Sequence, residues 1–147
     1  MAGVFFRAVR DAIASGTALK TLVQLIAATN VRVRINRIII STDGGTSSAV
    51  PILITLAKQT SAGTLTGLTL VKNTSADPET LQTTAGHTAT AEPTTTDIYD
   101  YVRIHPQGGR WEYVPNTPLY VPGGTRFGIL VTAAATVNCT VTVECEE

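Results

Sequence analysis

The stretch that decides the fold is the last one, Arg126 to Glu147, which reads RFGILVTAAATVNCTVTVECEE. In its second half, apolar and polar residues alternate strictly. Successive side chains of a β-strand point to opposite faces, so this alternation predicts a strand with one buried face and one solvated face. The residues predicted to face inward are Val137, Cys139, Val141, Val143 and Cys145.

The first half of the same stretch also has a period of two, with Phe127, Ile129, Val131 and Ala133 on one face. We expect the short link Ala134–Thr136 to close the two strands into a hairpin. A two-stranded ribbon is only marginally stable in water, so other strands must cover its apolar side. The residues therefore predict an all-β domain.

The segment Val31–Thr42 (VRVRINRIIIST) predicts a second strand, with an irregularity in its middle. Up to Ile35 its apolar residues have odd numbers, whereas Ile38 and Ile40 resume the inward set at even numbers. One extra residue at Asn36–Arg37, a β-bulge, would keep all of them on one face. The opposite face carries Arg32 and Arg34. We favour a solvated strand face for these arginines, and the alternative is a row of side chains that binds a partner.

Other short apolar runs, separated by turn residues, follow along the chain: Leu19–Ala28, Val50–Gln59, Leu65–Lys72, His87–Ala91, Asp97–His105 and Arg110–Val114. The long polar connection Asn73–Gly86 has room for one helical turn at Pro78–Leu81. About nine or ten short strands with no long helix between them predict a single antiparallel β-sandwich or barrel.

The opening segment, Met1–Ala18, is the most ambiguous, because its apolar residues recur both at helical and at strand spacing. We favour an opening strand or arm over residues 1–18, followed by a sandwich domain over residues 19–147. An exposed apolar arm would be an oligomer contact, whereas a strand would be tucked into the sheet. The candidate contact residues in it are Val4, Phe5 and Phe6.

The composition describes one globular domain with few charges. Of the 147 residues, 44% are hydrophobic and only 15% charged, which is too apolar for a disordered chain. The formal net charge is zero, and no basic block predicts binding to nucleic acid or to an anionic membrane. No run approaches the ~18 apolar residues of a membrane-spanning helix, and the opening segment lacks the uninterrupted apolar core of a secretion signal.

The two cysteines, Cys139 and Cys145, lie on one face of the same predicted strand. Six residues of extended chain separate them by about 20 Å, whereas a disulfide needs Cα atoms within about 7 Å. They are therefore predicted to be buried free thiols. Because both point into the core, they leave no set of ligands for a tetrahedral zinc site.

No motif in the sequence predicts catalysis or a cofactor. The two histidines, His87 and His105, have no partner at a spacing typical of a catalytic triad, although such partners need only meet in space. We interpret His105 as a hydrogen-bonding residue at the end of a loop. We therefore expect a protein that is not an enzyme and has no cofactor.

One aromatic group stands out near the middle of the chain. Its four members, which lie on two consecutive predicted strands, are Tyr99, Tyr101, Trp111 and Tyr113. Flat aromatic rings with polar rims can stack on sugar rings. The alternative is ordinary packing in the core or at a subunit interface, which we favour.

Three segments together resemble small virion structural proteins of tailed bacteriophages. They begin at Leu22 (LVQLIAATNVRVRINRIIISTDGGTSSAVPILITLAKQTSAGT), at His87 (HTATAEPTTTDIYDYVRIHPQGGRWEY) and at Val121 (VPGGTRFGILVTAAATVNCTVTVECEE). The resemblance covers roughly residues 19–147. Its most specific pieces are Ala91-Glu92-Pro93, His105-Pro106-Gln107-Gly108-Gly109 and Val121-Pro122-Gly123-Gly124.

The resemblance implies a jelly-roll-like sandwich that serves as a capsid decoration, or cement, protein. It also implies the major capsid protein as partner, a homo-oligomer with a trimer favoured, and a place on the capsid surface after assembly in the host cytoplasm. The alternatives are a carbohydrate- or receptor-binding module of a phage fibre, which would use the aromatic group, and a tail-associated structural protein.

Overall fold

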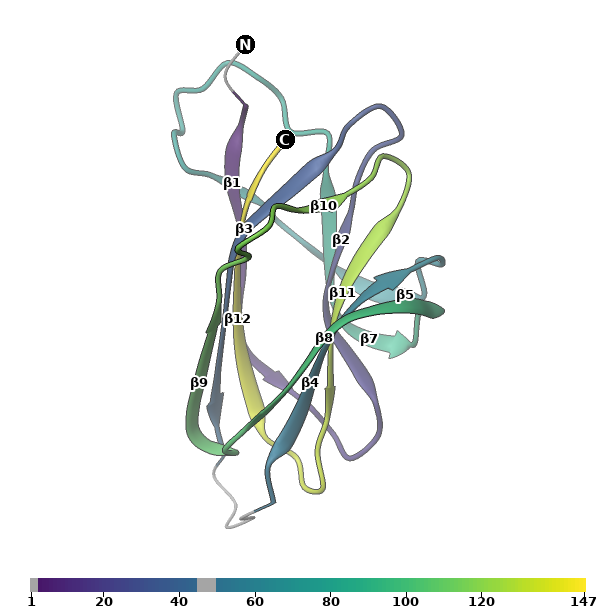
Figure 1. The fold of residues 1–147 in the computed structure, drawn as a ribbon, viewed down its shortest axis with the longest axis vertical. Coiled ribbons are helices and arrows are strands. Elements are labelled where there is room, and N and C mark those ends of the chain that lie inside the picture. The colour runs from purple at the N-terminus through teal and green to yellow at the C-terminus, as the bar shows by residue number, and fades with distance from the viewer. Residues whose placement is uncertain (1–2, 45–49) are drawn as a thin grey trace.

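The computed structural model describes residues 3–44 and 50–147, and the regular structure in these ranges consists of β-strands alone. The strands form two antiparallel sheets of six strands each, packed face to face as a sandwich (Figure 1). The predicted all-β sandwich is therefore confirmed. The described residues form twelve strands rather than nine or ten, and two of these, β6 and β10, are only two and three residues long.

The first sheet, called sheet A, has the order β10 (Leu119–Val121), β3 (Val33–Asp43), β12 (Asn138–Glu146), β1 (Phe5–Ala14), β6 (Val71–Lys72), and β9 (Gln107–Tyr113) also pairs with β3. The second, sheet B, has the order β5 (Thr64–Leu68), β7 (Thr84–Ala91), β2 (Lys20–Ile26), β11 (Arg126–Thr132), β4 (Ile52–Gln59), β8 (Thr95–Ile104). Strands β1 to β4 alternate between the sheets, and so do β11 and β12. This alternation is compatible with the jelly-roll-like arrangement that the resemblance implied.

The core lies between the two sheets and is formed by the residues that the alternation predicted. The four inward residues of β12 and Val137, which directly precedes this strand, are at most 2% exposed. The cysteines among them are free and buried. Burial raises the pKa of Cys139 to about 11, and it also raises the pKa of Cys145. Both thiols are therefore protonated at neutral pH.

The predicted hairpin between the last two strands is wrong. Strand β11 pairs with β2 and β4 in sheet B, whereas β12 pairs with β1 and β3 in sheet A. The link after Thr132 thus crosses from one sheet to the other. The physical reason is that a hairpin places two apolar faces side by side, whereas the crossing places them against each other across the core.

Two further local predictions can be compared with the structure. The bulge in β3 is confirmed, because the pairing with β12 passes from Ile35–Cys145 to Arg37–Glu144 and leaves Asn36 as the extra residue. The helical turn at Pro78–Leu81 is wrong, since that segment is irregular.

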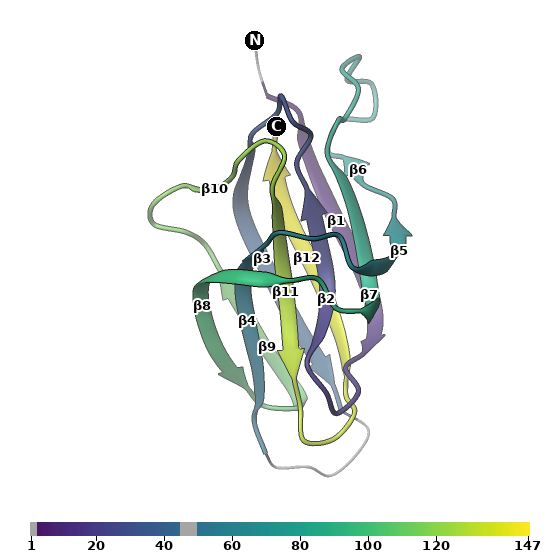
Figure 2. The same cartoon turned by 90° about the vertical axis from the view of Figure 1, so that its right-hand side faces the viewer.

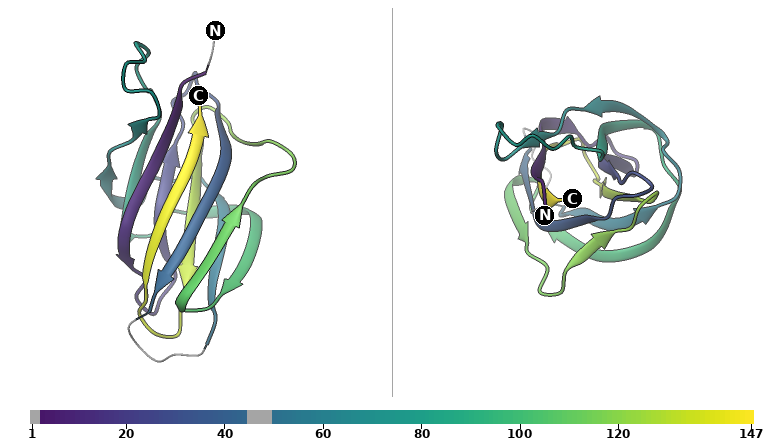
Figure 3. Two further views of the ribbon diagram at one scale, coloured as in Figure 1. Left: turned by 90° about the vertical axis from the view of Figure 1, so that its left-hand side faces the viewer. Right: turned by 90° about the horizontal axis from the view of Figure 1, so that it is seen from above.

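The opening segment forms strand β1, which lies between β12 and β6 in sheet A. Val4, Phe6 and Ala8 face the core, as expected for strand spacing. The two ends of the described chain meet in the same sheet, where the Val4 N–H donates to the Glu147 carbonyl at 2.8 Å and the Glu147 N–H to the Val4 carbonyl at 3.0 Å. Both termini therefore lie at one end of the sandwich (Figures 1 and 3).

Candidate interaction surface

The outer face of sheet A is open. In the view onto this sheet, none of the described segments crosses β1, β12, β3 or β9 (Figure 3, left). Cross-strand partners in an antiparallel pair point to the same side, so the register shows which side chains share this face. It consists of a row of charged residues with apolar and aromatic residues around it.

The charged row runs across four strands of sheet A. The Arg37 guanidinium on β3 binds the Glu144 carboxylate on β12 through two hydrogen bonds, from Nε to Oε2 at 2.9 Å and from Nη2 to Oε1 at 2.7 Å. Arg7 on β1 lies 3.3 Å from the same carboxylate. On the other side, Arg37 donates to Glu112 on β9 at 3.2 Å, and Arg110 lies 3.3 Å from Glu112.

These contacts determine the protonation of the central pair. The hydrogen bonds from Arg37 hold the pKa of Glu144 below its ordinary value, and the charges of Arg37 and Arg7 act in the same direction. Hydrogen bonding to Glu144 and Glu112 raises the pKa of Arg37 in turn. The Arg37–Glu144 pair therefore stays charged at neutral pH, as a geometry with two parallel hydrogen bonds favours.

An apolar cluster, Phe5, Val9 and Val71, lies beside this row at the β1–β6 edge. The register places Val71 opposite Arg7, and Arg7 opposite Glu144, on the outer face. All three apolar side chains are between 45% and 58% exposed. Large apolar side chains exposed as a group, rather than singly, are typical of contact sites on protein surfaces.

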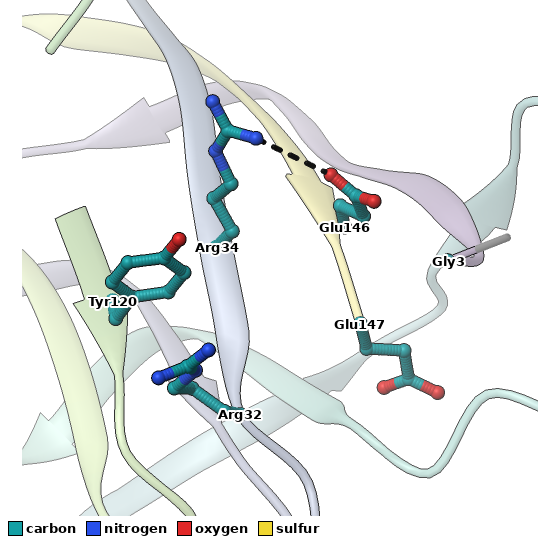
Figure 4. A pocket seen from close by; sticks show the side chains of 6 residues that line it. All are labelled: Gly3, Arg32, Arg34, Tyr120, Glu146 and Glu147. Atoms are coloured by element: carbon teal, nitrogen blue, oxygen red, sulfur yellow. Dashed lines mark ion pairs between the residues drawn. The ribbon is translucent and has the colours of Figure 1, made fainter. Parts of the chain in front are cut away.

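The opposite edge of sheet A carries a pocket of about 290 Å³ at the end where the termini lie (Figure 4). The Arg32 guanidinium lies 4.3 Å from the centre of the Tyr120 ring, a cation–π geometry. Arg34 lies next to it on β3 and 3.8 Å from the Glu146 carboxylate. The remaining lining residues are Gly3 and Glu147.

The outer face of sheet B is covered over much of its area. Two irregular segments, 60–63 and 92–94, cross in front of β11 and β2 (Figure 2). They are joined to each other by the Thr60 N–H, which donates to the Thr94 carbonyl at 2.9 Å, and by the Thr94 N–H, which donates to the Ser61 hydroxyl at 2.8 Å.

A buried polar network lies beneath these crossing segments. The Gln24 side-chain amide donates to Gln59 Oε1 at 2.8 Å and to the Ser61 carbonyl at 3.1 Å. The Gln59 amide donates to the Thr21 hydroxyl at 2.9 Å, and this hydroxyl donates to the Glu92 carboxylate at 2.7 Å. Each side chain of this network thus has a hydrogen-bond partner, which keeps the cost of its burial low.

Gly128 on β11 makes room for this network. A Cβ atom at this position would overlap the Gln59 side-chain amide, whose Nε2 atom would lie 2.7 Å away. The outer face of sheet B is therefore packed as a second, partly polar core. Its exposed parts lie toward the two edges of the sheet, at β5 and near β8, where Tyr101 and Ile98 lie.

The structure separates the three predicted contact residues. Phe5 points outward and is 46% exposed, whereas Val4 and Phe6 are 6% and 0% exposed. Of the three, only Phe5 can reach a partner without a change in the core. Its neighbours on the surface, Val9 and Val71, were not singled out by the sequence.

The four aromatic residues do not form one flat surface. Trp111 and Tyr113 on β9 are paired, with ring centres 5.5 Å apart, and pack against the edge of the core. Tyr99 packs on Phe127, with centres 5.9 Å apart, and burial raises the pKa of Tyr99. Tyr101 is 59% exposed and lies on the outer face of sheet B beside Leu53 and Arg103.

Neither histidine lies in a recognisable catalytic arrangement. His87 is buried, its Nδ1 lies 2.8 Å from the Thr88 hydroxyl, and burial, with Arg10 nearby, lowers its pKa. His105 Nδ1 accepts a hydrogen bond from the Gln107 N–H at 3.1 Å. Among the described residues, no three His, Cys, Asp or Glu residues are grouped to hold a metal ion.

Comparisons with protein families, with curated proteins and with solved structures find no match for this chain. In residues 3–44 and 50–147, no helix has the length and apolar character needed to cross a membrane.

The sequence did not reveal the charged row or the Arg32–Tyr120 contact. Both join residues that are far apart in the chain, such as Arg37 and Glu144, through strand pairing. The strand alternation did place Arg32 and Arg34 on an outer face, but the register was needed to find their partners.

Proposed function

We propose that this protein is a structural component of a tailed-bacteriophage virion, a decoration or cement protein that binds the head shell through the outer face of sheet A. The resemblance of its segments to such proteins supports the proposal. The observation that carries it is the difference between the two outer faces. Sheet B is covered by its own chain, whereas sheet A presents Phe5, Val9 and Val71 to solvent.

A cement protein acts by adding contact area between capsid subunits. Packed DNA pushes a head shell outward and strains the contacts between its subunits. A molecule that contacts several subunits of the major capsid protein at once opposes their separation, and many copies act together through multivalency. This role fits a homo-oligomer, with a trimer favoured, on the outside of a virion assembled in the host cytoplasm.

This role requires a rigid body and does not require catalysis or a cofactor. The chain provides rigidity by pairing its two ends in one sheet and by covering the outer face of the other. The charged row is also suited to recognition, because a partner must match alternating positive and negative side chains. Electrostatic matching of this kind contributes mainly to specificity and to the rate of association.

The experiment that tests the proposal is cosedimentation of the purified protein with phage heads that lack it. Removing residues 1–14 is unsuitable, because this would remove β1 from sheet A. Phe5→Ala is the better variant, and we expect it to lower occupancy on heads. Tyr101→Ala, which removes an even more exposed aromatic ring from sheet B, is the matched control and should bind as the wild type does. Absence of binding by the wild-type protein would contradict the proposal.

A second candidate function is recognition of a carbohydrate or another receptor by a phage fibre. Tyr101, Leu53 and Arg103 line an open pocket of about 500 Å³ on sheet B, and an aromatic ring beside an arginine suits a sugar ring. A glycan array separates the two functions. Binding that is lost in Tyr101→Ala and retained in Phe5→Ala would favour the receptor module over the cement protein.

A further inference from the structure

Most of the charged side chains in the described residues are engaged within the chain by a hydrogen bond or an ion pair. Those that are not include Arg10 on β1 and Arg103 on β8, and also three side chains at the end of the sandwich where the termini lie: Arg32, Asp77 and Glu79. The carboxylates of Asp77 and Glu79 have no hydrogen bond or ion pair with any described residue. The Arg32 guanidinium likewise has no acidic partner in the described part of the chain, and its one contact is with the Tyr120 ring. Free carboxylates and a free guanidinium are thus present on the same molecule.

Arg32 is oriented for recognition of a carboxylate. Its stacking on Tyr120 restricts the guanidinium to one plane while the N–H groups at its edge remain available. Planar guanidinium groups bind carboxylates through two parallel hydrogen bonds. Two acids line the same pocket, and both have other partners: Glu146 lies 3.8 Å from Arg34, and the Glu147 carboxylate accepts the Gln82 and Thr83 N–H groups.

Asp77 and Glu79 lie on a loop that is held in place. Lys72 Nζ donates to the Asp77 carbonyl at 2.6 Å and to the Glu79 carbonyl at 2.9 Å. At the far end of the loop, the Glu147 carboxylate accepts the Gln82 and Thr83 N–H groups at 2.7 and 2.9 Å. These contacts use the backbone, so that the two acidic side chains remain free. A loop fixed in this way loses little conformational entropy when it binds.

The two sites lie at opposite edges of sheet A, at the same end of the sandwich. Tyr120 is on β10 and the acidic loop follows β6, and these strands are the two ends of the order β10-β3-β12-β1-β6. Glu146 on β12 links both edges in register, since it lies opposite Arg34 on one side and Phe5 on the other. The loop projects beside the termini, as Figures 1 and 3 show.

We propose that the Asp77–Glu79 loop of one copy docks on the Arg32–Tyr120 site of a second copy. The occupant is a copy of this chain because the complementary charges are present on the chain itself, at the same end of the sandwich and on opposite edges of sheet A. Copies placed side by side in the same orientation would bring the β6 edge of one against the β10 edge of the next. Such a head-to-tail contact forms a closed ring when its rotation closes.

This contact concerns copies of the chain with one another and does not depend on a head shell. Its test is therefore separate from the cosedimentation experiment. A protein that associates through these sites but fails to bind heads would leave the contact intact and contradict the virion proposal. A protein that binds heads but does not self-associate would support the virion proposal and contradict the contact between copies.

The experiment is analytical ultracentrifugation of the wild type, Arg32→Glu, Glu79→Arg and the double variant Arg32→Glu/Glu79→Arg. We expect each single variant to weaken self-association about tenfold or more, since like charges then face each other. The double variant restores opposite charges and should regain association. Arg103→Glu, which changes an arginine on sheet B that is also exposed, is the control and should associate as the wild type does.

Raised salt should weaken the wild-type association, because the contact is electrostatic and partly exposed. Recovery in the double variant would exclude misfolding as the cause of the losses in the single variants. A wild-type protein that stays monomeric at high concentration would overturn the proposal. Single variants that associate as strongly as the wild type would overturn it equally.

Discussion

Gln24 and Gln59 on the outer face of sheet B are fully buried, whereas Arg7 and Glu144, in the middle of the outer face of sheet A, meet solvent. Both faces carry polar side chains on paired strands, and both satisfy them through side-chain hydrogen bonds. The difference is that segments 60–63 and 92–94 cross sheet B and leave sheet A free. A chain of this length can cover only part of its surface, and the part left open is available to partners.

The largest expected effect on stability is at Phe6, and its neighbour Phe5 on β1 provides the comparison. Phe6→Ala removes a fully buried ring and should lower the free energy of unfolding by about 3–5 kcal/mol. Phe5→Ala removes a ring from the open face and should change it by less than about 1 kcal/mol, while weakening binding to partners. Denaturant unfolding of both variants checks this prediction. Similar losses in the two variants would mean that the open face is part of the folding core.

The covered face can be tested through glycine. Gly128→Ala places a methyl group against the buried Gln59 amide, and we expect a loss of about 1–3 kcal/mol in the free energy of unfolding. Gly67→Ala is the matched control, because no atom lies within 4 Å of a Cβ atom built there. Thermal unfolding should separate the two variants clearly. An unchanged midpoint in Gly128→Ala would show that the network under the crossing segments is loosely packed.

The charged row on sheet A should contribute less to stability than the core or the covered face of sheet B. Because the pKa of Glu144 is held below its ordinary 4.5 in the folded state, its contribution is present above pH 4.5 and is lost as the pH falls through the lowered value. Glu144→Gln should cost at most about 1 kcal/mol at neutral pH, and its difference from the wild type should vanish in acid. Urea unfolding across this pH range gives the measurement, with Glu79→Gln as a control that removes an unpaired carboxylate.

The smallest expected effect is the reaction of the two cysteine thiols on the inner face of β12 with a thiol reagent. Burial raises the pKa values of Cys139 and Cys145, so that neither thiol ionises readily in the folded protein. We expect no reaction with a thiol reagent at mildly alkaline pH, and complete reaction of both thiols after addition of denaturant. Rapid labelling of the native protein would show that β12 separates from the core on the time scale of the measurement.

The sequence predicted the individual strands better than their partners. The bulge in β3 was predicted because the inward apolar residues change from odd numbers at Ile35 to even numbers at Ile38. The inward residues of β12 were predicted from strict alternation. The hairpin of β11 and β12 was not predicted correctly, because a short link is compatible both with a turn within one sheet and with a crossing between two sheets. The periodicity of each strand is the same in either case.

The candidate surface was predicted only in part. Phe5 was identified as a contact residue because it is apolar and near the start of the chain, and the same reasoning selected Val4 and Phe6, which are buried. The partners of Arg37 and Arg32 depend on register between strands that are distant in the chain. No local pattern contains that information.

Alternation of side chains thus determined, from sequence alone, that this chain forms strands with one apolar face, because the backbone of a strand directs successive side chains to opposite sides. Tertiary structure decided which outer face stays open. That choice depends on where two short irregular segments cross, and on a polar network whose members, Thr21, Gln24, Gln59 and Glu92, meet only when the sheet has formed.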